Sequence, residues 1–134
     1  MRALSTSLAL LLSAVILGGS VQPALAQDDG SIPIARVKYS GGGDWYSDEK
    51  SLPELLAFVR QNTLLDVAKN EDVVELTSDK LYAYPYLYLT GHGNIRLSEA
   101  EAERLRRYLL GGGFLHVDDN YGLDDNIRRE LKKV

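Results

Sequence analysis

Cysteine is absent from all 134 residues, and this absence excludes several kinds of chemistry. The chain can form no disulfide, can bind no metal through thiolates and can use no cysteine nucleophile. Internal repeats and low-complexity tracts are also missing. The chain therefore reads as one small domain that depends on its hydrophobic core alone.

The chain also lacks a large cluster of positive charge. Fifteen Lys and Arg face nineteen Asp and Glu, which gives a formal net charge of −4. Two basic clusters, at 104–107 and 128–133, fall in the later turns of expected helices, where positive charge complements the helix dipole. Binding to nucleic acid or to an anionic membrane is driven by clustered Lys and Arg, so we expect neither kind of partner.

Only the first residues contain a long apolar run. Arg2 precedes the stretch LALLLSAVIL at 8–17, and Ala24-Leu25-Ala26 offers small residues for cleavage. We interpret residues 1–26 as a secretory signal peptide, with an exported, periplasmic protein as the consequence. The alternative is a transmembrane anchor, but a span needs about 20 apolar residues. No later stretch reaches that length, so we expect no membrane span after cleavage.

The remaining sequence predicts alternating strands and helices. After a flexible lead-in at 27–33, strands are expected at 34–39, 73–76, 86–90 and 114–119. Helices are expected from Ser51 and from Ser98, each opening with the Ser-x-x-Glu spacing of a capping box, and from Asp124. A shorter helical segment is expected at 77–84. The strand at 114–119 is apolar on both faces, which predicts a place inside the sheet.

Residues 86–122 organise the rest of the chain. An apolar strand, a polar turn, an amphipathic helix, a glycine stop and a second apolar strand form a β-α-β unit with parallel strands. Ligands of such sheets bind beyond the carboxyl ends of the strands. His92 and the run Asp118–Asn120 are expected at that edge.

Four segments together resemble a known family. They read YSGGGDWY, YLYLTGHGN, LRRYLLGGGFLHVDDNYG and LDDNIRRELKKV, and they cover nearly all of the chain after the signal peptide. In this order they are similar to the bacterial family called domain of unknown function 4159, whose name implies no established activity. The resemblance implies a flavodoxin-like three-layer α/β sandwich with a mostly parallel sheet, shaped like class I glutamine amidotransferases. Family members are usually longer, so residues 34–134 are expected to be a single α/β domain truncated at the C-terminus.

The same resemblance places two turns of the amidotransferase fold. The turn TGHGN at 90–94 sits where that fold forms an oxyanion hole, and the turn at 117–122 sits where it carries the cysteine nucleophile. Here that turn reads Val-Asp-Asp-Asn-Tyr-Gly. A carboxylate is a much poorer nucleophile toward amides than a thiolate, so glutaminase activity is not carried over.

His92 and the two aspartates are the candidate catalytic residues. His92 lies between two glycines in a turn, where it is either a metal ligand, general base or binding group, or a turn histidine bonded to neighbouring backbone. Asp118 and Asp119 alternate across the strand, so one of them points to each face. Each is either a functional carboxylate or a cap or solvated group. His116, inside the strand, is interpreted as a satisfied interior histidine.

A glycine-rich turn places further candidates at the same edge. Gly41–Gly43 allow close approach of the backbone beside Asp44, and the neighbouring aromatic residues either stack on a sugar or other planar ligand or simply cover the sheet. The predicted ligand-binding residues are Asp44, Trp45, Tyr46, Gly91, Gly93, Asn94, Asn120 and Tyr121.

These observations favour a binding or interaction module that has lost the nucleophile, with a small polar ligand or another exported protein as its partner. The alternative is a metal-assisted hydrolase in which Asp44, His92 and either Asp118 or Asp119 hold a hard divalent cation that activates water, with Asp119 as the preferred ligand of the two. No other cofactor is evident. A third possibility is a non-functional fragment whose unpaired sheet edge invites aggregation.

Overall fold

A computed structural model describes residues 30–134. The expected signal peptide and residues 27–29 of the expected lead-in lie outside the described residues. The strands are β1 (Ile34–Lys38), β2 (Asp72–Glu75), β3 (Tyr86–His92) and β4 (Phe114–Tyr121). The helices are α1 (Ser51–Asn62), the 3₁₀ helix η1 (Asp79–Ala83), α2 (Glu99–Leu110) and α3 (Asp124–Leu131). Within residues 30–134 no helix combines the length and apolar character that crossing a bilayer requires.

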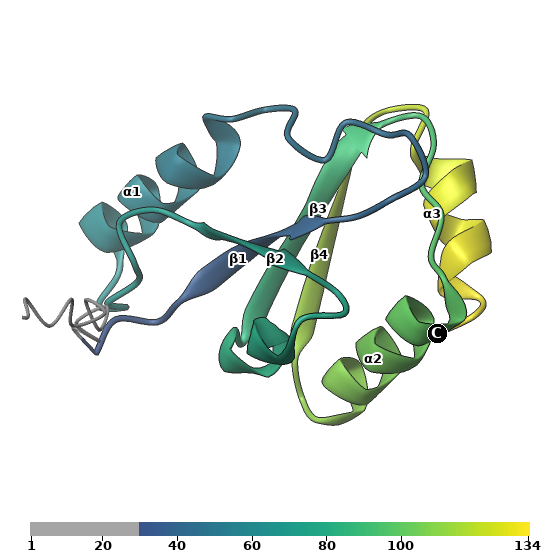
Figure 1. The fold of residues 1–134 in the computed structure, drawn as a ribbon. Helices are drawn as coiled ribbons and strands as arrows, with labels where there is room; N and C mark the ends of the chain where they lie inside the picture. Colours follow the sequence, from purple (N-terminus) through teal and green to yellow (C-terminus); the bar gives the residue numbers. More distant parts are fainter. Residues whose placement is uncertain (1–29) are drawn as a thin grey trace, which may run out of the picture.

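The four strands form one parallel sheet in the order β2-β1-β3-β4. Helix α1 lies on one face, and α2 and α3 lie on the other, which gives three layers (Figure 1). This is the expected flavodoxin-like α/β sandwich. The strand order reverses between β1 and β3, and in such sheets the crevice beyond this switch point is the usual ligand site.

The two faces of the sheet bury cores of different size. The larger core lies between the sheet, η1, α2 and α3, and includes Leu76, Leu87, Leu89 and Leu105. The smaller core lies under α1. It consists of Ile34, Leu52, Leu56, Val67 and Tyr88, with Val59 and Tyr86 packed against it. Most of the burial that holds the domain together is therefore on the α2 and α3 side.

The two expected capping boxes had different outcomes. At α2 the prediction is confirmed: the Ser98 side chain accepts from the Glu101 N–H, and the Glu101 carboxylate accepts from the Ser98 N–H. At α1 the prediction is wrong, because Ser51 is already helical and no side chain caps that end. The Ser51 hydroxyl instead donates to the Asp48 carbonyl, 2.8 Å away.

The expectation that residues 114–119 lie inside the sheet is also wrong. Within residues 30–134, β4 pairs only with β3 and forms an edge of the sheet. Leu115 and Val117 pack against the larger core, whereas Phe114 on the other face is 59% exposed and stacks on Tyr86. An apolar pattern on both faces indicates contacts above and below a strand; it does not report how many strands lie beside it.

Candidate functional site

Two segments meet at the switch point and bring an aspartate to a histidine. Asp44 follows β1, and His92 is the last residue of β3. One Asp44 carboxylate oxygen accepts from the His92 backbone N–H at 2.5 Å, and the other lies 2.8 Å from Nδ1 of the His92 ring. The carboxylate thus fixes both the backbone and the side chain of the histidine. We call this Asp44–His92 pair and the turns that carry it the rim.

The electrostatics of the rim keep the Asp44 carboxyl group ionised. The His92 backbone N–H is the main cause that lowers the pKa of Asp44; partial burial opposes it, and the His92 ring adds to the lowering. Asp44 is therefore a carboxylate, which can only accept, so Nδ1 carries the proton that is shared with it. Nε2 has no hydrogen-bond partner among residues 30–134. The His92 side chain is 49% exposed, so Nε2 can reach a ligand.

A buried tyrosine supports the rim from below. Tyr39 is 5% exposed, and its hydroxyl finds no partner among the described residues. Burial, followed by the nearby charge of Asp44, raises the pKa of Tyr39 to about 12. A Cβ on Gly91 would lie 2.0 Å from this hydroxyl, and one on Gly43 would lie 2.8 Å from it. Glycine is therefore required at both turns: the Tyr39 hydroxyl leaves no room for a Cβ at residue 91, and the Asn94 carbonyl, 2.1 Å from a Cβ at residue 43, adds to the crowding there.

A buried arginine, which the sequence analysis did not single out, holds the turn after Asp44. Arg36 is 3% exposed in the middle of β1. Its guanidinium donates to the carbonyls of Ser47 at 2.7 Å and Asp48 at 3.1 Å. The available signal was a charged residue at the centre of a short apolar strand, because such a residue is buried only when its donors are satisfied.

The two aspartates of β4 point to opposite faces, as their alternation predicts. Asp118 accepts from the Tyr88 hydroxyl at 2.8 Å on the α1 face. Asp119 accepts from the Leu123 N–H at 2.8 Å and so caps the turn that leads into α3. His116, partly buried, lies 2.6 Å through Nδ1 from the Tyr86 hydroxyl. These three side chains are bonded within the fold, and the capping interpretation of one aspartate is confirmed for Asp119.

The three predicted metal ligands are not brought together as a set. Asp44 and His92 are paired, but Asp119 is bonded at the start of the turn before α3. In the part of the chain that the structure describes, no group of three or more histidines, aspartates and glutamates is arranged to hold a metal. A cation at the rim would have at most the Asp44 carboxylate and the imidazole as ligands.

The remaining predicted binding residues lie around the rim. Trp45 packs against the larger core and meets Tyr46 edge to face at 5.6 Å. Tyr46 is 59% exposed and Tyr121, paired in register with His92, is 81% exposed. Gly93, Asn94 and Asn120 complete the exposed turns, and Gly93 donates its N–H to the Tyr121 carbonyl at 3.1 Å. Two tyrosine rings are thus open to solvent at this edge.

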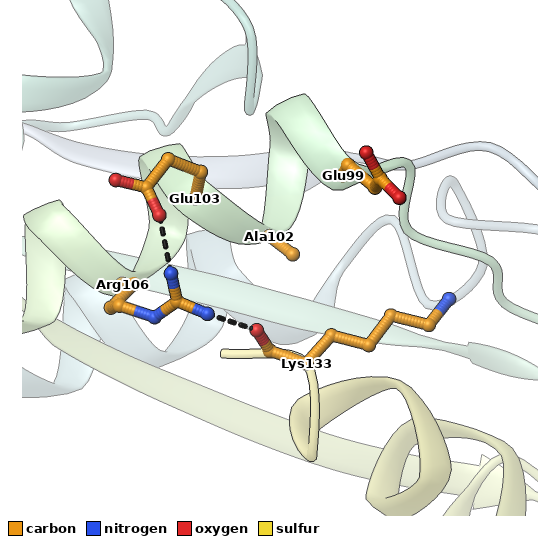
Figure 2. A pocket seen from close by; sticks show the side chains of 5 residues that line it. All are labelled: Glu99, Ala102, Glu103, Arg106 and Lys133. Carbon is orange, nitrogen blue, oxygen red and sulfur yellow. Dashed lines mark hydrogen bonds and ion pairs between the residues drawn. The ribbon is translucent and has the colours of Figure 1, made fainter.

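A separate cavity lies between α2 and the residues after α3. It has a volume of about 550 Å³ and is lined by Glu99, Ala102, Glu103, Arg106 and Lys133 (Figure 2). Arg106 reaches across it to Glu103 and to the Lys133 carbonyl, and also donates to the Val134 carbonyl at 2.7 Å. None of the predicted site residues lines this cavity. Its polar groups join α2 to the residues after α3, so its role is structural.

The comparison with protein families finds one family for this domain. The family model described as Domain of unknown function (DUF4159) matches residues 33–134. The chain belongs to this family. The match covers every strand and helix described above, including the turns with Asp44 and His92. A comparison with curated proteins found no match.

Proposed function

We propose that this DUF4159 domain is a binding module that takes a small polar ligand at its rim, with His92 as the central contact. The observation that carries the proposal is the preformed Asp44–His92 pair, whose Nε2 is unengaged at the switch point. Because Asp44 holds the ring through Nδ1, Nε2 is left to form a hydrogen bond with a ligand. A polar group such as a hydroxyl, which both donates and accepts, can bind there.

The surroundings of His92 narrow the ligand class. Tyr46 and Tyr121 present exposed aromatic rings, and such rings stack on the apolar faces of sugars and other flat ligands. A hydroxyl group supplies a hydrogen-bond partner for Nε2. A sugar or related polyol meets both conditions. Another exported protein that presents such groups on its surface would bind at the rim in the same way.

The missing nucleophile favours binding over covalent catalysis. The chain contains no cysteine, and no serine or threonine hydroxyl of residues 30–134 is hydrogen-bonded to His92. A histidine base without a neighbouring nucleophile cannot form the acyl intermediate of an amidotransferase. The apolar stretch and small residues within 1–26 support export, and we place the module in the periplasm on that basis.

Isothermal titration of the purified domain with a panel of mono- and disaccharides tests the proposal. We expect a sugar to bind to the wild type and His92→Ala to abolish the binding heat. His116→Ala is the matched control, because His116 is bonded to Tyr86 and lies outside the rim. If no panel member binds, or if His92→Ala binds as the wild type does, the rim is not a sugar site.

A second function is favoured by the same pair. An imidazole oriented by a carboxylate through Nδ1 is the arrangement of a general base that activates water through Nε2. The alternative is then a hydrolase. A divalent cation would make it metal-assisted only by displacing the Nδ1 proton from between Asp44 and His92, and water and substrate would fill its open positions. Turnover of a bound sugar derivative that is lost in His92→Ala and depends on added Mg²⁺ or Mn²⁺ would show that the domain is a metal-assisted hydrolase and not a binding module.

A further inference from the structure

We infer that Arg36 is the positioning residue of the rim: its guanidinium holds the turn 44–48 in the one arrangement that brings the Asp44 carboxylate to His92. This deepens the proposed function, since it explains how the same site is preformed, and its biological meaning rests on that function. The contacts that support this inference are those of the protein without a ligand.

Arg36 contacts several backbone carbonyls of the turn after Asp44. It donates to the carbonyls of Ser47 and Asp48 at 2.7 and 3.1 Å, and the Trp45 carbonyl lies 3.5 Å away. Three carbonyls of four successive residues thus converge on one buried cation. Glu71, which precedes β2, provides the counter-charge at 3.5 Å. Because the side chain is almost fully buried, these contacts are shielded from water and hold the turn closely.

The carbonyls that Arg36 binds belong to the turn that begins at Asp44. The Ser47 N–H donates to the Asp44 carbonyl at 2.8 Å, so Asp44 opens the same turn whose last carbonyls Arg36 holds. Asp48 has a φ of 54°, in the left-handed region that a non-glycine residue adopts only at a cost. The bond from Arg36 offsets that cost. Without Arg36, the turn loses these contacts, which fix the position of Asp44.

The guanidinium of Arg36 also contacts the strand that carries His92. Arg36 lies over the Tyr88 ring, with 5.4 Å between the guanidinium carbon and the ring centroid. Tyr88 belongs to β3, the strand that ends at His92. Arg36 therefore contacts both partners of the rim: the turn that carries Asp44 and the strand that carries His92. A lysine cannot replace it, because one ammonium group cannot reach several carbonyls in a plane and stack on a ring.

The test compares three variants by ¹⁵N NMR of the histidine rings, which reports the tautomer of His92 directly. Arg36→Lys keeps the charge beside Glu71 but loses the planar fork. Glu71→Gln removes the counter-charge and leaves the carbonyl contacts. Lys38→Met is the matched control on the same strand, where Lys38 is half exposed and pairs with Glu75 at 2.9 Å. The wild type is expected to show His92 with the proton on Nδ1.

We expect Arg36→Lys to mix the two His92 tautomers, and Glu71→Gln and Lys38→Met to keep the wild-type signature. A folded Arg36→Lys with the His92 spectrum of the wild type would overturn the inference. If Arg36→Lys does not fold, a urea titration of the wild type decides: hindered rotation of the Arg36 guanidinium and the Nδ1–H signal of His92 must be lost together. Loss of the first while the second persists also overturns it. No ligand is present in either experiment, so a failed sugar titration leaves this result unaffected.

Discussion

Tyr39 buries a hydroxyl group that has no hydrogen-bond partner among residues 30–134. Its neighbours are the backbones of Gly43 and Gly91 and the charge of Asp44. A buried polar atom without a hydrogen bond is costly, so the aromatic ring must contribute enough packing between the two glycine turns to outweigh that cost. The residue therefore acts through its shape, as a support for the rim.

This gives a prediction for Tyr39→Phe, which removes the hydroxyl and keeps the ring. The free energy of unfolding is expected to rise by about 1 kcal/mol, because an unsatisfied buried group is deleted. Urea denaturation measures the change. Tyr84→Phe is the control, because the Tyr84 hydroxyl donates to Asp72 at 3.0 Å and its loss should destabilise by about 1 kcal/mol. Equal destabilisation in both variants would show that the Tyr39 hydroxyl has a partner in solution.

At this scale the sequence identified the exposed residues of the rim more readily than its buried supports. Asp44 and His92 could be selected because each follows a strand beside glycine, and glycine-rich turns at the carboxyl edge are typical of sites. The separation of Asp119 from them follows from β4 continuing to Tyr121 and from the turn that Asp119 caps. The signal for Arg36 was a charge at the centre of a short apolar strand, which indicates burial but not the groups that it binds. Tyr39 could not be selected, because alternation along a strand gives the face of a side chain and says nothing about what lies above it.

At the scale of elements, a buried carboxylate of α3 bonds to the segment before α2. Glu130, with its side chain 4% exposed, accepts from the Leu97 N–H at 2.8 Å and from Lys133 at 2.5 Å. Burial opposes ionisation of Glu130, but the bonds from Lys133, Leu97 and Arg129 outweigh it and lower its pKa to about 2. The ionised group thus stabilises the contact between two elements.

The sign of the pH dependence follows from that shift. The folded pKa of about 2 lies below the ordinary value of 4.5, so the stabilisation is complete above pH 4.5 and is lost as the pH falls from 4.5 toward 2. We expect the Tm difference between wild type and Glu130→Gln to be largest near neutral pH and to shrink over this range. Calorimetry at several pH values measures it. Glu75→Gln, an exposed position on β2, is the control, and a Glu130→Gln difference that stays constant to pH 2 would contradict the prediction.

Elements were predictable where the pattern is local. The capping box at Ser98 is correct because Ser98 and Glu101 each bond to the other's backbone. Ser51 is instead the first residue of α1, and its hydroxyl bonds to the Asp48 carbonyl of the preceding turn, which also binds Arg36. The edge position of β4 was missed for a related reason. Strand neighbours are set by distant segments, and the apolar residues of β4 are equally compatible with an interior strand.

At the scale of the whole molecule, the two faces of the sheet differ in how much apolar surface they bury. Helix α1 contributes Leu52 and Leu56 to a core of five buried residues, whereas α2 contributes to the larger core that spans the sheet, η1 and α3. Buried apolar area is the main source of stability, and regions with little of it open first. The turn that carries Asp44 leads directly into α1, and the Ser51 N–H donates to the Asp48 carbonyl of that turn. Opening of α1 would therefore disturb the turn before the sheet itself unfolds.

Native-state hydrogen exchange tests this order of opening. The amides of α1 are expected to exchange through an opening of lower free energy than the amides of β3 and α2. Leu56→Ala should lower the free energy of that local opening by about 2–5 kcal/mol, whereas Leu105→Ala should lower the free energy of global unfolding by a similar amount. Leu56 and Leu105 are both almost fully buried, so the pair is matched in chemistry and differs only in the face of the sheet. Equal protection of α1 and α2 in the wild type would show that Arg36 and the small core bind α1 as firmly as the larger core binds α2, and the domain would then open as a single unit.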